Sequence, residues 1–254
     1  MIAEERHLRI LDLIRARRFV KTTDLANTFG VSEETIRRDL EHLVTGGMAR
    51  RIHGGAMIPQ GTGLEPPYES RTNLHVAAKK KIAAFAAGLV NEGDTLIIDI
   101  GTTTLEFAKC LHDKGDLTVL TNSLPVAMEL TLNRAAKIFL LGGMIRPDEM
   151  SLSGFLTEHA LREFYVDKAI LGAGGVSLRE GITDYNVSEA QARKLMITRA
   201  KEVIVLADHS KFGVTALTSV VPLSSVHKIV TDSGIPAADL QALTGEGIEV
   251  IVTD

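Results

Sequence analysis

The chain has 254 residues, of which 45% are hydrophobic and 24% are charged. This length and balance exclude a peptide scaffold and a disordered chain, and they predict one or two domains with a sizeable core. The single cysteine, Cys110, excludes an internal disulfide, and no Cys/His spacing predicts a zinc site, so we expect no metal and no cofactor. We expect a cytoplasmic protein without membrane insertion, because the chain shows neither a spanning apolar run nor the apolar core of a signal peptide.

The charge is uneven along the chain. The formal net charge is −4, from 28 Lys+Arg and 32 Asp+Glu, so the whole chain does not point to a nucleic-acid partner. The first 56 residues carry ten Lys+Arg and eight Asp+Glu, which leaves 18 and 24 for the rest. A basic head on an acidic body is typical of a DNA-binding module joined to a part that must not bind DNA.

Three helices are predicted in the first 45 residues. Apolar residues recur at helical spacing over residues 4–17 and 24–29, and a third helix runs from Ser32, a typical N-cap, to Val44. Its apolar stripe consists of Ile36, Leu40 and Leu43. Residues 48–55 then predict a short two-stranded wing.

The outer face of the third helix is polar and partly cationic, which suits the major groove of DNA. We expect contacts to DNA bases and phosphates from Ser32, Thr35, Arg37 and Arg38 on the helix and from Arg50, Arg51 and His53 on the wing. The alternative is a solvated helix face on which Arg38 pairs with Glu34 or Glu41.

Residues 58–74 predict a linker, because they hold Pro and Gly without a periodic apolar face. A DNA-binding domain would then cover residues 1–57 and a second domain residues 75–254. In the second domain, apolar runs alternate with helical patterns. The runs are 95–100, 117–121, 137–141, 167–171, 202–207, 228–231 and 248–252, and the helical segments are 76–90, 105–111, 124–132, 157–164, 188–200 and 237–243. This alternation predicts a Rossmann-like, mostly parallel α/β sheet covered on both faces.

Ligands of such sheets bind beyond the carboxyl ends of the strands, and the residues that follow these runs are unusually polar. We expect an anion such as phosphate to bind at the hydroxyl-rich helix start that follows the first run. A cation far downstream, Lys211, would contact the same anion. The candidates are Asp99, Gly101, Thr102, Thr103, Thr104, Asn122, Ser123, Gly142, Gly143, Gly174, Asp208 and Lys211. Three alternatives stay open: a Thr-rich helix cap without a ligand, a simple turn at Gly142-Gly143, and a surface salt bridge at Lys211.

Short stretches in both predicted domains carry a family resemblance. The segment Thr35 to Leu40 and the ending His53-Gly-Gly-Ala resemble the winged helix-turn-helix of DeoR-type bacterial transcriptional regulators. Asp99-Ile-Gly-Thr-Thr-Thr, Leu120-Thr-Asn-Ser and Leu206-Ala-Asp-His-Ser-Lys-Phe-Gly resemble the sensor domain of the same family, which is similar in fold to ribose-5-phosphate isomerase. The resemblance implies a repressor of a sugar catabolic operon, controlled by a phosphorylated sugar, and it adds Glu189 to the effector-binding residues.

Gly174 departs from the family pattern, because many relatives and the isomerases carry an Asp in this loop. Isomerisation of a sugar phosphate needs a general base, so the loss of a carboxylate disfavours catalysis. We therefore expect a non-enzymatic regulator with double-stranded operator DNA and a phosphorylated sugar as partners. It would act as a homo-oligomer, a dimer or tetramer, because one winged head reads only a short site. The alternatives are a sugar-phosphate isomerase-like enzyme and an architectural DNA-binding protein without a ligand.

Overall fold

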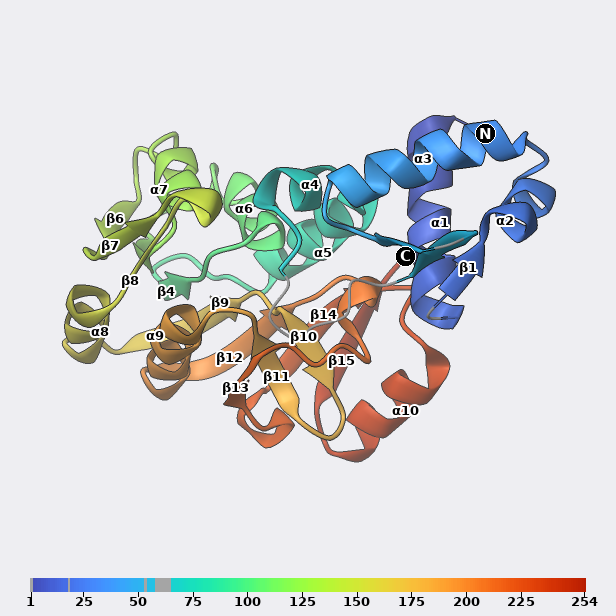
Figure 1. Cartoon of the computed structure of the whole chain (residues 1–254). Coiled ribbons are helices and arrows are strands. Elements are labelled where there is room, and N and C mark those ends of the chain that lie inside the picture. The colour runs from blue at the N-terminus through green and yellow to red at the C-terminus, as the bar shows by residue number, and fades with distance from the viewer. Residues whose placement is uncertain (1, 18, 53, 58–64) are drawn as a thin grey trace. The chain divides into compact units, whose positions relative to one another are not determined.

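The computed structural model describes residues 2–17, 19–52, 54–57 and 65–254, which form two compact units, Met1–His75 and Val76–Asp254. None of the described helices combines the length and the apolar character that crossing a membrane takes. Figure 1 shows the elements of both units.

The N-terminal unit is built around the three predicted helices, which are confirmed. They are α1 (Ala3–Arg17), α2 (Thr22–Phe29) and α3 (Glu33–Thr45). The predicted stripe of α3 forms part of the core, since Ile36, Leu40 and Leu43 are completely buried. They pack with Ile10 and Ile14 of α1 in one apolar cluster. The sequence period therefore gave the inner face of α3 correctly.

The wing has three strands, whereas the sequence predicted two. β2 (Arg50–Ile52) and β3 (Gly55–Met57) form the expected hairpin, and β1 (Phe19–Lys21) pairs with the other side of β3. Three residues between two helices are too short for a strand period, so β1 left no signal in the sequence. Gly55 lies so close to β1 that a Cβ atom would stand 2.0 Å from the carbonyl oxygen of Val20.

A short helix, α4 (Tyr68–Asn73), lies within the stretch predicted to be a linker. The hydroxyl of Ser70 donates a hydrogen bond of 3.3 Å to the carbonyl oxygen of Gly46, the C-cap residue that follows α3. Leu74 packs against the apolar cluster of the N-terminal unit. Residues 58–64 lie outside the described residues, and the linker boundaries 58–74 remain a prediction.

The second unit contains a seven-stranded sheet of the order β15-β14-β12-β9-β4-β5-β6, in which every neighbouring pair is parallel. Each strand coincides with one of the seven predicted apolar runs. The strands are β4 (Thr95–Ile98), β5 (Thr118–Thr121), β6 (Lys137–Leu140), β9 (Val166–Leu171), β12 (Ala200–Leu206), β14 (Lys228–Asp232) and β15 (Glu249–Thr253). The predicted fold class is confirmed.

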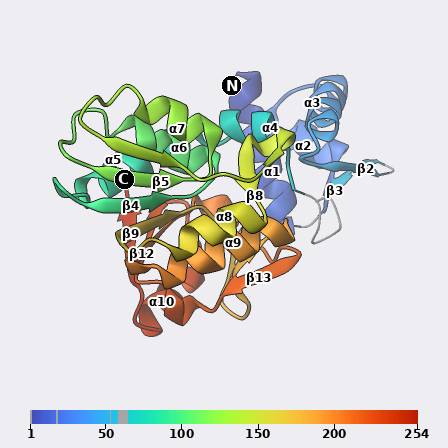
Figure 2. The ribbon, with the colours of Figure 1, turned by 90° about the vertical axis from the view of Figure 1, so that its left-hand side faces the viewer.

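Helices cover both faces of this sheet (Figure 2). One face carries α5 (Val76–Gly88), α6 (Thr102–Lys109) and α7 (Leu124–Leu130), and the other carries α8 (Phe155–Arg162), α9 (Val187–Thr198) and α10 (Ala237–Gly245). Successive strand residues therefore enter different cores. On β4, for example, Leu96 and Ile98 pack on the α5 side, and Ile97 packs on the α8 side.

Short strands complete the unit, and the sequence did not predict them. β7 (Met144–Arg146) and β8 (Ser151–Ser153) form an antiparallel pair. β10 (Gly175–Ser177), β11 (Gly181–Asp184) and β13 (Thr218–Val221) form a small antiparallel sheet. Strands of three or four residues are specified by their partners in space, which a single sequence does not reveal.

Candidate nucleic-acid interface and candidate effector site

The N-terminal end of α3 is fixed by Ser32. Its hydroxyl accepts a hydrogen bond of 3.1 Å from the backbone N–H of Thr35 and lies 2.9 Å from the Thr35 hydroxyl. This is the N-cap that the sequence predicts. Ser32 is exposed and Thr35 half-buried, so both hydroxyls lie at the surface at the start of the helix. Contacts of these two residues with DNA remain a prediction.

Arg37 and Arg38 project from the exposed face of α3 and pair with acidic residues one turn earlier. A guanidinium nitrogen of Arg37 lies 3.4 Å from Glu33, and Arg38 Nε lies 3.3 Å from Glu34. The side chain of Arg38 is 78% exposed. Exposed pairs of this kind contribute roughly 0–1 kcal/mol, so a DNA phosphate or guanine can replace the glutamate at little cost. A solvated helix face would show the same Arg38–Glu34 pair. The pair is therefore compatible both with a DNA contact of Arg38 and with a solvated face.

On the wing, Arg50 and Arg51 are both exposed on β2. Arg50 lies within 3.4 Å of the sulfur of Met57 on the neighbouring strand β3. His53 lies outside the described residues. The wing therefore presents two cations beside the α3 face.

A buried ion pair on the inner side of α3 was not predicted. Asp39 accepts hydrogen bonds of 2.6 and 3.0 Å from Arg6 of α1, and its carboxylate lies 2.8 Å from His7 Nε2. Burial raises the pKa of Asp39, but the hydrogen bonds from Arg6 and His7 lower that pKa by more, so it lies below its ordinary value. This contact holds α3 against α1.

In the second unit, the strand order places a topological switch point between β4 and β9. From β4 the sheet continues through β5 and β6, and from β9 it continues through β12, β14 and β15. Open α/β sheets bind ligands beyond the carboxyl ends of the strands at this point. The predicted site residues follow the carboxyl ends of five neighbouring strands: Asp99 after β4, Asn122 after β5, Gly142 after β6, Gly174 after β9 and Asp208 after β12.

The hydroxyl-rich helix start after β4 has the predicted form. Gly101 adopts φ 135°, a conformation that favours glycine, and α6 begins at the next residue. Thr102, Thr103 and Thr104 are buried, and the Thr104 hydroxyl donates to the carbonyl oxygen of Gly101 at 3.0 Å. The first backbone N–H groups of a helix have no partner within it and attract anions. This helix start can therefore hold a phosphate group.

Two buried polar residues, Asn122 and Ser123, follow β5 and make different hydrogen bonds. Asn122 Nδ2 donates to the carbonyl oxygen of Leu152 at 2.9 Å, while its Oδ1 atom has no hydrogen-bond partner among the described residues. Ser123 accepts a hydrogen bond of 3.3 Å from the backbone N–H of Val126 and caps α7. A buried acceptor without a partner is unfavourable unless a ligand or water satisfies it, so Asn122 Oδ1 suits a sugar hydroxyl.

Arg193 of α9 is a central residue that the sequence did not reveal. Its Nε atom lies 2.6 Å from Asp99 Oδ2, and a second guanidinium nitrogen pairs with Asp184 of β11. All three side chains are buried. Asp99 also accepts a hydrogen bond of 3.1 Å from the backbone N–H of Gly172. Asp99 therefore ties the carboxyl ends of β4 and β9 together, rather than projecting as a free carboxylate.

Glu189 is held in the same region by two residues of the β7–β8 pair. One carboxylate oxygen accepts from Arg146 at 2.8 Å, and the other accepts from the Ser151 hydroxyl at 2.8 Å. Asn186 caps α9 by accepting from the backbone N–H groups of Ser188 and Glu189. Ser151 forms a β-bridge with Ser123, so Glu189 is brought to the loop after β5.

Two of the predicted glycines are required by close packing. A Cβ atom on Gly143 would lie 2.4 Å from the Thr157 hydroxyl and 2.7 Å from the carbonyl oxygen of Ser153. At Gly174 it would lie 2.9 Å from the carbonyl oxygen of Thr183 on β11. Gly142 has open space, and its carbonyl oxygen accepts from Thr157 at 2.5 Å. An Asp at position 174 would therefore require a shift of β11.

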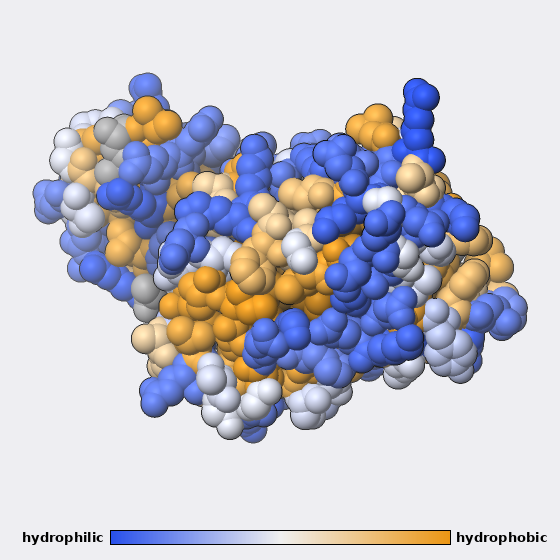
Figure 3. Space-filling model, turned by 180° about the vertical axis from the view of Figure 1, so that it is seen from behind, coloured by the Kyte–Doolittle hydropathy of each residue, from blue (hydrophilic) through white to orange (hydrophobic). Residues whose placement is uncertain are grey.

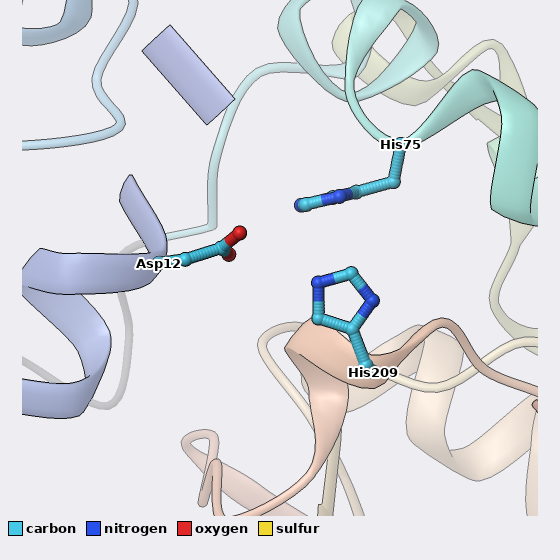
Figure 4. A group of neighbouring side chains, drawn as sticks. All are labelled: Asp12, His75 and His209. Carbon is cyan, nitrogen blue, oxygen red and sulfur yellow. The ribbon is translucent and has the colours of Figure 1, made fainter. Parts of the chain in front are cut away.

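The loop after β12 begins with buried Asp208, whose carboxylate accepts from the backbone N–H of Ser210 at 3.0 Å and caps a 3-10 turn over His209–Lys211. Lys211 is half-buried in this turn. The ring of His209 projects from the same turn (Figure 4), and its Nδ1 atom lies 2.7 Å from Asp232, at the end of β14. Burial raises the pKa of Asp232, and hydrogen bonds from His209 lower it by more, so it lies below its usual value.

Known protein families match both units of the chain. A family model described as the DeoR-like helix-turn-helix domain matches residues 6–62, and one described as the DeoR C terminal sensor domain matches residues 74–233. The chain is 35% identical to an uncharacterized HTH-type transcriptional regulator, YulB, of Bacillus subtilis, over 98% of this chain and 96% of that one.

Two further relatives have names that state a role. The chain is 34% identical to a putative aga operon transcriptional repressor of Escherichia coli O157:H7, over 98% of this chain and 93% of that one. It is 32% identical to the glycerol-3-phosphate regulon repressor of Escherichia coli K12, over 97% of both chains. Among solved structures, it is similar to a D-ribose-5-phosphate isomerase in complex with phospho-erythronic acid, with 21% identity, 53% of each chain covered and a TM-score of 0.39.

Proposed function

The chain belongs to the DeoR family of transcriptional regulators, and we propose from this premise that it represses a sugar catabolic operon until a phosphorylated sugar binds its sensor unit. The observation that carries the proposal is that one chain holds both an N-capped helix with an exposed arginine face and a sheet edge suited to a phosphate. A regulator that binds operator DNA acts where the DNA lies, so we also propose a cytoplasmic location.

The DNA-binding residues that we propose are those of the exposed α3 face and of the wing: Ser32, Thr35, Arg37, Arg38, Arg50, Arg51 and His53. The geometry supports this set because Ile36 and Leu40 hold the opposite face of α3 in the core. The helix can therefore enter a major groove without uncovering apolar residues.

The effector-binding residues that we propose lie at the carboxyl ends of the central strands. The start of α6 and Lys211 would hold the phosphate group, and Asn122 and Asp208 would contact sugar hydroxyls. Asp99 and Glu189 act as positioning residues, because ion pairs and hydrogen bonds already occupy their carboxylates. Their occupied carboxylates are not free to accept a proton, so neither Asp99 nor Glu189 would serve as the general base that an isomerase needs.

The test combines DNA binding with a panel of sugar phosphates. Fluorescence anisotropy with DNA from upstream of the protein's own gene should show tight binding, and one phosphorylated sugar of the panel should release the protein. Ligand and DNA must be coupled by about 1–3 kcal/mol for a 5- to 150-fold change in affinity. If no member changes either DNA affinity or thermal stability, the sensor half of the proposal is wrong.

Two variants separate the two halves of the proposal. Arg38→Ala should weaken operator binding by about 1–3 kcal/mol, whereas Lys80→Ala, on the exposed face of α5, should not. Lys211→Ala should keep operator binding and lose release by the effector. Unchanged DNA binding in Arg38→Ala would show that its side chain only belongs to a solvated face. Weakened DNA binding in Lys211→Ala would contradict its place in the effector site.

A further inference from the structure

One end of the second unit carries a group of exposed apolar side chains that no described element covers. They lie on β6, on β7 and at the start of α8, all on the left-hand side of Figure 1. We call them the β6–α8 surface: Phe139, Leu140, Met144, Ile145, Phe155 and Leu156, which are 44–76% exposed. A stable monomer rarely leaves such large side chains exposed side by side.

Contacts between β6, β7, β8 and α8 show that these elements adjoin one another. The ring of Phe139 lies 5.5 Å from that of Phe164, which follows α8. The carbonyl oxygen of Gly142, after β6, accepts from Thr157 of α8. Met144 of β7 pairs with Ser153 of β8, two residues before α8 begins. The elements that carry the six apolar side chains therefore adjoin one another around the edge of the sheet at β6.

The β6–α8 surface is uncharged, and β6 is an edge strand. Residues 138–145 and 150–157 contain no Asp, Glu, Lys or Arg. β6 ends the seven-stranded sheet, so one side of its backbone has no strand partner. Proteins usually protect such an edge with charges or with a covering element. Lys137 at the start of β6 is the one charge on this strand, and Ile138, Phe139 and Leu140 leave the rest of the edge apolar, which indicates that another molecule covers it.

We propose that the β6–α8 surface is covered by the same surface of a second copy of this chain. Residues 57–254 carry 18 basic and 24 acidic residues, so two such units repel each other except where charges are absent. An uncharged surface can meet its own copy around a two-fold axis without bringing like charges together. Its six side chains, with Met128 on α7 and Leu132 just after that helix, expose an apolar area of several hundred Å², since a single aromatic side chain presents about 150–250 Å². Each partner in a standard interface buries about 800 Å².

The surface also adjoins the candidate effector site. The β7 strand that carries Met144 and Ile145 ends at Arg146, and β8 begins with Ser151, and these two residues bind Glu189. Pairing of two copies therefore fixes the strands that hold a site residue. This link between assembly and effector binding rests on the proposed function, whereas the pairing itself does not.

The experiment is sedimentation of the full chain over a wide range of protein concentration, without DNA or effector. The wild type should form a dimer or a larger even-numbered assembly. Phe155→Lys should raise the dissociation constant about tenfold or more, because it places a charge at the centre of an apolar contact. Met144→Lys should act in the same way. Unchanged circular dichroism and thermal unfolding would show that both variants still fold.

Phe85→Lys on α5 is the matched control, because Phe85 is also exposed (45%) but lies outside the β6–α8 surface. Figure 3 shows that hydrophobic side chains also gather on another face of the molecule. The control therefore tests whether a charge on any exposed apolar side chain weakens association, or only a charge on the β6–α8 surface. A wild type that is monomeric at every concentration overturns the proposal. So does a Phe155→Lys variant that associates like the wild type, or a Phe85→Lys variant that dissociates as readily. As a second measurement, hydrogen exchange of peptides from residues 138–157 should slow on association.

Discussion

Arg193 neutralises two buried carboxylates at once, those of Asp99 and Asp184. Arg193→Met would leave Asp99 and Asp184 buried without a cation. Removing one partner of a buried ion pair costs about 3–5 kcal/mol. We expect urea unfolding to show a loss of that size. Arg162→Met is the matched control, since Arg162 is exposed and pairs with Glu158 at 3.9 Å, and it should change the free energy of unfolding by less than about 1 kcal/mol.

Asp39 predicts how acid acts on the N-terminal unit. Its pKa is lower in the folded chain than in the unfolded chain, so its contribution to stability is present above the unfolded value, about 3.9. That contribution is lost as the pH falls through the folded pKa. Asp39→Asn should therefore be less stable than the wild type at pH 7 and should lose less stability on acidification.

Urea unfolding at neutral and acid pH, followed by circular dichroism, measures this difference. Glu41→Gln is the control, because Glu41 is exposed on the same helix. If Asp39→Asn and the wild type lose equal stability in acid, the Arg6–Asp39–His7 contact does not set the acid sensitivity of the N-terminal unit.

At the scale of elements, α9 positions two residues of the candidate site, Glu189 and Arg193. Asn186 caps its first turn with two hydrogen bonds. Asn186→Ala should lower the free energy of unfolding by about 1 kcal/mol, within a range of about 0.5–2 kcal/mol, whereas Asn186→Asp keeps an acceptor and should stay close to the wild type. Thermal and urea unfolding of both variants check this. Equal losses in the two variants would mean that the cap contributes little to the start of α9.

The elements also show what a single sequence can and cannot give. The inner strands of the parallel sheet were predictable because strands buried on both faces are continuous apolar runs, and the edge strand β6 has such a run although Phe139 and Leu140 are exposed. The stripe of α3 was predictable because a helix repeats every 3.6 residues. The pairing of Arg193 with Asp99 was not, because it joins residues 94 positions apart and has no periodic signal. The same holds for Arg146 and Glu189, which only the short strand β7 brings together.

For the whole molecule, the separation of charge predicts how salt acts on DNA binding. The affinity should fall linearly with salt on logarithmic axes, with a slope of about −0.9 per phosphate contacted. Arg51→Ala should reduce the slope by about one and should weaken binding to all DNA sequences alike. Arg179→Ala, a 91% exposed side chain of the second unit, is the control and should leave the slope unchanged. Anisotropy titrations at several salt concentrations measure both. If the Arg51→Ala variant shows the same salt slope as the wild type, Arg51 of the wing does not contact a DNA phosphate.

The hydrogen bond from Ser70 to the carbonyl oxygen of Gly46 joins α4 to the last turn of the helix that we propose enters the DNA groove. α4 ends at Asn73, and α5 of the sensor begins at Val76. Only two residues of chain therefore separate a helix anchored on the DNA reader from the first helix of the sensor. Because two residues leave little slack in the chain, we expect a rotation of α5 to be passed on to the DNA reader.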